Sequence, residues 1–272
     1  MSLAETLKVQ RLAGWRPSLP QPAALLPYAV PAAILILWEI AGAAGLIADT
    51  VMPRPSAILA TAVRMTASGE LLNHLGVSAT RALAGLAVGG GIGFALGIAN
   101  GVWRRSELLT DATLQMIRNI PHLALIPLVI LWFGIGEGAK LFLVALGVFF
   151  PIYLNTLHGI RNVDPQLIEM GRAYGMNGRT LFRRIVLPGA LPSIFVGLRY
   201  GLGIMWLTLI VAETLSASSG LGYMAMQARE FMILDVVVLA ILLYAALGKL
   251  ADTLTRALER RALKWSPAYA NH

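Results

Sequence analysis

The stretch EMGRAYGMNGRTLFRRIVLP, residues 169–188, lies between two long apolar runs and decides how the rest of the chain is interpreted. Five of its twenty residues are charged, and four of those five are arginines. Glycines punctuate it, which is typical of turns. A basic segment with turn residues inside an apolar chain indicates a folded connection on one face of a membrane.

The composition points the same way. The chain has 272 residues, of which 57% are hydrophobic and 13% charged, with a mean hydropathy of +0.70. Soluble domains carry about 25% charged residues, so an integral membrane protein is expected. No cysteine is present, and the four histidines lie far apart without an HExxH pattern, so we predict no metal site and no catalytic residues.

Six apolar runs approach the length that a helix needs to cross a bilayer, about 20 residues. They are residues 25–46, 82–103, 119–135, 139–159, 191–213 and 232–249. The first run could imitate a secretory signal, but it is longer than an ordinary signal core, so we interpret it as a retained span. The predicted fold is all-α and polytopic, with about six transmembrane helices.

The distribution of basic residues predicts the orientation. With the N-terminus in the cytoplasm, fifteen Lys and Arg residues lie on the inner side and five on the outer side. Both termini are then cytoplasmic, as segments 1–24 and 254–272, and flank one transmembrane domain over residues 25–253. The segment 53–80 starts with prolines and predicts a short helix at the outer surface.

The connection over residues 161–188 predicts two short helices. Asp164 can cap a helix that starts at Pro165 and stops at Gly175, and a second helix covers about 178–186, ending at Leu187 and Pro188. We call this pair the knob. Its arginines are expected to face outward, and its apolar residues are expected to fill its interior: Leu167, Met170, Tyr174, Leu181, Phe182 and Ile185. Such a knob is suited to docking into a groove of a partner.

A glycine occurs at every fourth residue of the second apolar run, namely Gly85, Gly89, Gly93, Gly97 and Gly101. On a helix these positions form a groove without side chains, which another helix can approach closely. The stripe predicts a helix-packing seam, either static or between moving helices. The local GGGIG lacks the Lys-Ser/Thr pair of a phosphate loop, so nucleotide binding is not expected there.

The knob carries a family resemblance. Glu169-Met-Gly-x-x-x-Gly175, nine further residues and then Ile185-x-Leu187-Pro188 resemble the "EAA" loop of bacterial ABC-importer permeases, with Met170 and Gly171 in place of the two alanines. Residues 118–140, 187–214 and 219–231 look like the nitrate/sulfonate/taurine branch, and more narrowly like aliphatic sulfonate permeases.

The resemblance implies a type I permease fold in the bacterial inner membrane and a homodimer. It also implies a periplasmic substrate-binding protein and a cytoplasmic ATPase dimer that binds ATP and Mg²⁺, so this chain would hold no cofactor and perform no catalysis itself. No nucleic-acid partner is expected. The residues that would couple to the ATPase are Glu169, Gly171, Arg172, Tyr174, Gly175, Met176, Asn177, Leu181 and Phe182.

Polar residues inside apolar runs are candidates for the translocation path, because they are costly in a membrane without water or partners. The candidates are Arg118, His122, Arg199, Trp206, Thr208 and Glu213. Guanidinium groups suit a sulfonate anion. Arg118 and His122 would share a helix face at the inner end of the third run if the backbone stays helical through Pro121. Arg118 could instead snorkel to the interface, Arg199 could form a buried ion pair, and Glu213 suits a structural or gating role.

Other functions remain open at the level of sequence. The same family pattern serves taurine, nitrate, bicarbonate and pyrimidine-precursor carriers. An ion-coupled secondary transporter would show related halves and paired acidic sites, and residues 25–135 and 139–249 show no clear repeat. A membrane enzyme would need clustered catalytic groups, and none is apparent.

Overall fold

The structure is a computed structural model that describes residues 26–265, and regular structure within this range is entirely helical. The chain divides into two compact units, residues 1–57 and 58–272. The predicted cytoplasmic segment 1–24 lies outside the described residues, and so does the end of the predicted tail after residue 265.

The first unit contains helix α2 (Leu26–Ala43) and the loop that follows it. Glu39 accepts hydrogen bonds from the Ser56 backbone N–H at 3.0 Å and from the Ser56 hydroxyl at 2.8 Å. Arg54 pairs with Asp49 at 3.3 Å. The polar Glu39 in this apolar helix is therefore satisfied by Ser56, in the first turn of helix α3 (Pro55–Ala67).

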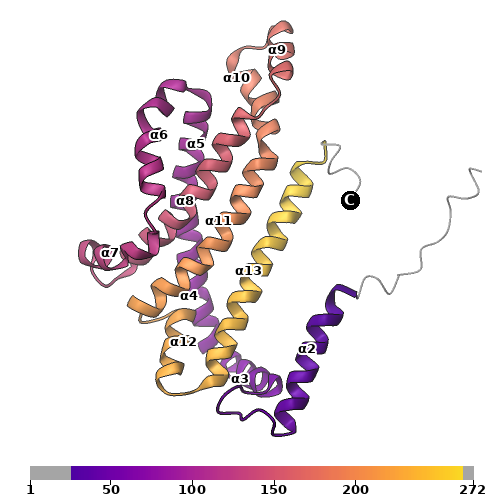
Figure 1. Ribbon diagram of the computed structural model, residues 1–272, viewed down its shortest axis with the longest axis vertical. Helices are drawn as coiled ribbons and strands as arrows, with labels where there is room; N and C mark the ends of the chain where they lie inside the picture. The colour runs from indigo at the N-terminus through magenta and orange to yellow at the C-terminus, as the bar shows by residue number, and fades with distance from the viewer. Residues whose placement is uncertain (1–25, 266–272) are drawn as a thin grey trace, which may run out of the picture. The chain divides into compact units, whose positions relative to one another are not determined.

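Four long helical segments form the body of the second unit (Figure 1). Helices α4 (Glu70–Gly85), η2 (Leu86–Gly90) and α5 (Gly91–Val102) are continuous, and α8 (Glu137–Arg161) returns beside them. Helices α10 (Gly178–Leu181), η4 (Phe182–Val186) and α11 (Leu187–Ser216) form the third segment, and α13 (Leu234–Ala262) the fourth. All four are long and apolar enough to cross a membrane.

The third predicted run has a different form. Helix α6 (Arg104–Arg118) leads to the short η3 (His122–Leu125) and α7 (Ile126–Phe133), and the pair is bent by 81° at the break. Taken together, the two halves are long and apolar enough to count as one span. The described residues therefore contain four candidate spans, or five with the bent pair. Pro121 explains the break, because proline has no N–H to continue the helix. The first predicted run forms α2, whose apolar part, Ala29–Ala43, is shorter than a full span.

The glycine stripe lies against α8. A Cβ atom on Gly89 would stand 2.0 Å from the Ala145 carbonyl oxygen, and one on Gly93 would stand 2.6 Å from the Phe149 carbonyl oxygen. Gly85, Gly97 and Gly101 are equally close to α8. The side-chain-free face therefore lets the backbones of η2 and α5 approach that of α8.

The core lies where α8 contacts α4, α5 and α11. Val144, Val148 and Ile152 of α8 pack with Ala82, Met205 and Leu209. Helix α13 covers α11, and its course to Ala262 passes through the domain boundary predicted at 253. Two shorter helices, α3 (Pro55–Ala67) and α12 (Leu221–Glu230), lie in the connections before α4 and between α11 and α13.

Candidate functional site

The knob forms as the local sequence predicts. Helix α9 (Pro165–Ala173) starts after Asp164, whose carboxylate accepts from the Gln166 backbone N–H at 2.8 Å. Gly175 has φ of 74°, a left-handed conformation that few other residues adopt. Asn177 then caps α10 by accepting from the Thr180 backbone N–H at 2.9 Å. The predicted cap, first helix and glycine stop are confirmed.

Gly171 explains how the two knob helices fit together. A Cβ at this position would stand 2.6 Å from methyl carbons of both Leu181 and Ile185, and 3.5 Å from the Met176 sulfur. Gly171 and Leu181 are buried. The glycine in place of a family alanine therefore allows the second helix to lie directly against the first.

The apolar face of α9 differs from the prediction. Leu167, Met170 and Tyr174 are exposed instead of filling the interior, and Tyr174 retains 79% of its surface. The interior is small because Gly171 brings the helices together, which leaves no room for these side chains. Glu169, Arg172 and Arg179 are also exposed, so the knob presents a mixed apolar and charged surface.

The second knob helix also differs from the prediction, because it does not end before Pro188. The turn η4 is π-helical and continues directly into α11, so residues 178–215 form one segment. Pro188 lies in the first turn of α11, where its missing N–H is tolerated after the π turn. The second knob helix is thus joined to α11 without an intervening loop.

A salt bridge joins the base of the knob to α6. Arg161, the last residue of α8, pairs with Glu107 in the first turn of α6. The knob lies at this end of the α8 and α11 pair, and α12 lies at the opposite end (Figure 1). Helix α6 then runs from the knob end beside α5, and none of its residues is buried.

A pocket of about 460 Å³ lies midway along the bundle and contains two of the predicted path residues. We call it the central pocket. It is lined by Ile117, Arg118, Ile120, His122, Leu146, Gly147, Phe150, Pro151, Leu154, Asn155, Tyr200 and Ile204. The backbone is not helical through Pro121, so the condition for Arg118 and His122 to share a helix face is not met, yet both line the same pocket.

Thr208 reaches the same region from α11. The His122 Nε2 atom lies 3.0 Å from the Thr208 hydroxyl oxygen, and Thr208 is fully buried. The structure therefore brings three of the six predicted path residues together: Arg118, His122 and Thr208.

Arg199 and Trp206 lie on the face of α11 that packs against α13. Arg199 pairs with Glu259 and, at 3.4 Å, with Asp252, both on α13. Trp206 contacts the ring of Tyr244 edge-on with ring centroids 6.2 Å apart, and it lines an apolar groove with α13. Neither residue lines the central pocket. For Arg199 the ion-pair alternative describes the observed contacts.

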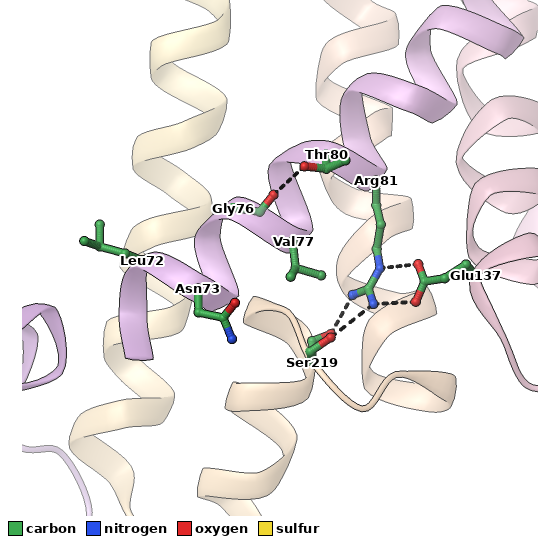
Figure 2. Close-up of a pocket in the computed structure, with 8 residues that line it drawn as sticks. All are labelled: Leu72, Asn73, Gly76, Val77, Thr80, Arg81, Glu137 and Ser219. Carbon is green, nitrogen blue, oxygen red and sulfur yellow. Dashed lines mark hydrogen bonds and ion pairs between the residues drawn. The ribbon is translucent and has the colours of Figure 1, made fainter. Parts of the chain in front are cut away.

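A second cavity, of about 580 Å³, lies near the start of α12, at the end of the bundle away from the knob. Figure 2 shows the residues that line it. Its lining includes Arg81 of α4, Glu137 at the start of α8, and Ser219 before α12. Arg81 Nε and Nη2 each donate to a carboxylate oxygen of Glu137 at 2.6 Å. Glu137 also pairs with Lys140 at 2.9 Å. Arg81 is a buried residue of a continuous helix.

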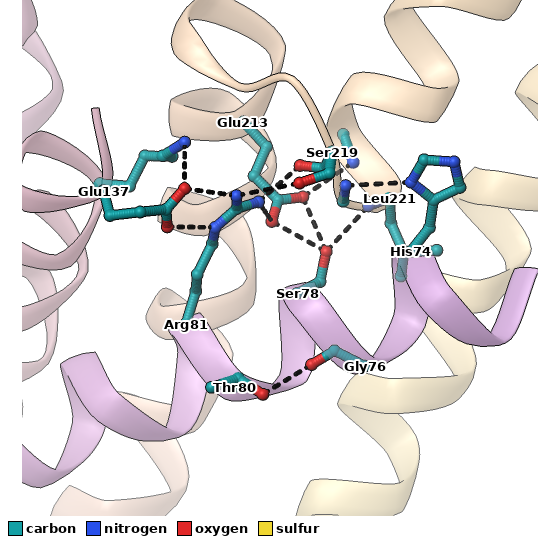
Figure 3. Close-up of polar contacts among 12 residues, drawn as sticks. His74, Gly76, Ser78, Thr80, Arg81, Glu137, Glu213, Ser219 and Leu221 are labelled. Atoms are coloured by element: carbon teal, nitrogen blue, oxygen red, sulfur yellow. Dashed lines mark hydrogen bonds and ion pairs between the residues drawn. The ribbon is translucent and has the colours of Figure 1, made fainter. Parts of the chain in front are cut away.

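Behind this cavity, Glu213 is buried at the centre of a polar cluster (Figure 3). Its carboxylate accepts from Arg81 at 2.9 Å, Ser78 at 2.8 Å, the Gly222 backbone N–H at 2.9 Å and the Tyr244 hydroxyl at 3.1 Å. We call this set, with Glu137, Lys140 and Ser219, the Arg81 cluster. It joins α4, α8, α11, α12 and α13.

The cluster also holds the start of α12. The Gly220 backbone N–H donates to His74 Nδ1 at 3.0 Å, and the Leu221 backbone N–H donates to the Ser78 hydroxyl at 2.8 Å. A Cβ on Gly220, whose φ is 113°, would stand 2.4 Å from a Glu213 carboxylate oxygen. Glu213 therefore serves as a structural anchor, and the prediction that it lines the path is not supported by these contacts.

The sequence contained one signal for this cluster. His74, Ser78 and Arg81 are spaced four and three residues apart, which places them on one face of a helix. No group of three or more His, Cys, Asp or Glu side chains within residues 26–265 could hold a metal ion.

These features define a polytopic helical membrane protein with a two-helix knob at one end and a helix pair bent by 81°. The model of the family described as "Binding-protein-dependent transport system inner membrane component" matches residues 87–264. The chain belongs to this family and is a permease subunit of such a transport system.

Two relatives support this family assignment. The chain is 56% identical to the putative aliphatic sulfonates transport permease protein of Escherichia coli K12, over 89% of this chain and 92% of that protein. It is 45% identical to the Bacillus subtilis 168 protein of the same description, over 88% and 87%. A crystal structure of an amino acid ABC transporter matches with a TM-score of 0.60 at 18% identity, covering 73% of this chain and 97% of that chain. That likeness confirms the fold.

Proposed function

We propose that this chain is the membrane permease of an ABC importer for aliphatic sulfonates. The observation that supports this substrate class is the identity of 56% and 45%, over most of the chain, to permeases described for aliphatic sulfonates. Two copies form the translocation path, and a periplasmic binding protein delivers the sulfonate. Both termini of each copy lie in the cytoplasm.

A separate ATPase dimer binds ATP and Mg²⁺ and hydrolyses the ATP. The exposed residues Leu167, Met170 and Tyr174 support this proposal, because an apolar patch at the tip of a charged knob suits a partner's groove. Glu169 and Arg172 add charged contacts at its edge. Docking there would let the ATPase move α9 as a unit.

Two connections carry that movement into the bundle. The continuous helix from Gly178 passes it to α11, and the Arg161–Glu107 pair passes it to α6. Helix α6 ends at Arg118 in the central pocket. ATP binding at the knob can thus change the shape of the path, which alternating access requires.

Uptake in cells tests the substrate. A bacterium that lacks its own sulfonate permease is supplied with this chain, its ATPase and its binding protein. We expect accumulation of labelled butanesulfonate that an excess of unlabelled alkanesulfonate reduces at least tenfold. Nitrate, bicarbonate, taurine and a pyrimidine precursor should compete poorly, and stronger competition by any of them would assign the chain to that substrate instead.

A further inference from the structure

Arg118 differs from Arg81 and Arg199, which pair with carboxylates of other helices in the second unit. Arg81 and Arg199 each contact two carboxylates. Arg118 is exposed to the central pocket, and its hydrogen-bond acceptor is the Gln115 side chain on the same helix, at 3.5 Å. Within residues 26–265 no carboxylate forms a salt bridge with Arg118, so its guanidinium group can receive an anion.

The depth of Arg118 makes this exposure informative. Helix α6 starts at the knob end and has fifteen residues, so its last residue lies about 20 Å from that end along the helix axis. A cation at that depth is costly unless it meets water or an anion, and such residues mark substrate pathways. Broken helices at the middle of a membrane are also typical of transporter binding sites.

The polar side of the pocket is fixed in place. His122 is held by its contact with buried Thr208, and the Asn155 amide donates to the Pro151 carbonyl at 2.8 Å. Gly147 leaves the space for this arrangement, since a Cβ there would stand 2.9 Å from the Thr208 hydroxyl oxygen. Arg118, His122 and Asn155 therefore present polar groups to one cavity.

The remaining wall is apolar and comes from α6, α8, α11 and the break that follows α6. It consists of Ile117, Ile120, Leu146, Phe150, Leu154 and Ile204, with Tyr200 at its side. A pocket with one cation, fixed polar groups and an apolar wall matches a ligand with an anionic head and a short hydrocarbon chain. Its volume of about 460 Å³ is in the range of small-molecule sites.

We infer that the central pocket is a substrate site within the membrane, where Arg118 holds the sulfonate group and the apolar wall receives the alkyl chain. The inference rests on the proposed function and adds that the permease itself selects for charge and chain. The substrate therefore pauses in the permease after the binding protein has released it.

Equilibrium binding tests the head-group contact. The complex of permease and ATPase, in nanodiscs and without the binding protein, is titrated with labelled hexanesulfonate. We expect saturable binding that Arg118→Gln weakens at least tenfold and that Arg118→Lys weakens less. Arg105→Gln is the matched control, because Arg105 is an exposed arginine at the other end of α6, and it should bind as the wild type does. Absent wild-type binding, or equal binding by Arg118→Gln, would overturn the site.

A chain-length series tests the apolar wall. Ile204→Ser should weaken hexanesulfonate several-fold more than methanesulfonate, since only the longer chain reaches the wall. An equal loss for both ligands would overturn the assignment of the wall. An assay of ATP-driven uptake by the same wild-type complex, with the binding protein present, distinguishes a failure of this inference from a failure of the proposed function. Uptake without binding at the pocket removes this inference alone, whereas no uptake removes the proposed function as well.

Discussion

Replacement of Arg81 by alanine is expected to produce a large loss of stability. Arg81 is 5% exposed, and its guanidinium group contacts Glu137 and Glu213 and donates to both the carbonyl and the hydroxyl of Ser219. Its removal leaves the buried Glu213 carboxylate without a cation, which costs roughly 3–5 kcal/mol. For a chain of this size that corresponds to a fall in unfolding midpoint of about 6–20 °C.

Thermal unfolding of the purified protein in detergent, followed by tryptophan fluorescence, measures this change. Arg64→Ala is the matched control, because the Arg64 side chain is 70% exposed and lies 3.7 Å from Asp235. An exposed pair contributes about 0–1 kcal/mol, so the control should unfold within about 4 °C of the wild type. Equal midpoints for the two variants would show that the Arg81 cluster does not hold the helices together.

Replacement of Tyr174 by aspartate is expected to release the ATPase. Tyr174 is 79% exposed at the end of α9, so the substitution leaves the knob folded and places a charge in the proposed interface. Tyrosines at the centre of interfaces commonly contribute 2 kcal/mol or more, so we expect at least a tenfold weaker association. Glu169→Arg should weaken it as well, because it reverses a charge on the same surface.

Co-purification of the ATPase with tagged permease measures the association. Phe231→Asp is the control, because Phe231 is an aromatic residue of similar exposure, 68%, at the end of α12. That variant should retain the wild-type amount of ATPase. If Tyr174→Asp also retains it, the ATPase does not dock on the exposed face of α9.

The knob could be predicted from the sequence because its determinants are local. Asp164, Pro165 and Gly175 act through the backbone within a few residues, and these are the signals that capping rules describe. The exposure of Leu167 and Met170 could not be predicted, because it follows from the close packing that Gly171 allows. An apolar helical face does not by itself reveal whether it faces the core or a partner.

The Arg81 cluster could not be assembled from the sequence because its members are far apart. Arg81 meets Glu137 and Glu213 across 56 and 132 residues, and only the packing of α4, α8 and α11 brings them together. The central pocket has the same origin. Helix α6 was not predicted as part of a span, because its own composition is polar, so Arg118 was placed at a membrane interface.

ATP-driven uptake by reconstituted liposomes is the decisive measurement. The liposomes contain this chain and its ATPase, with ATP inside and the binding protein and labelled butanesulfonate outside. We expect uptake to require the binding protein and ATP, and to fall at least tenfold when the only change is Tyr174→Asp in the knob. Undiminished uptake by liposomes that contain this chain without the ATPase would contradict the account.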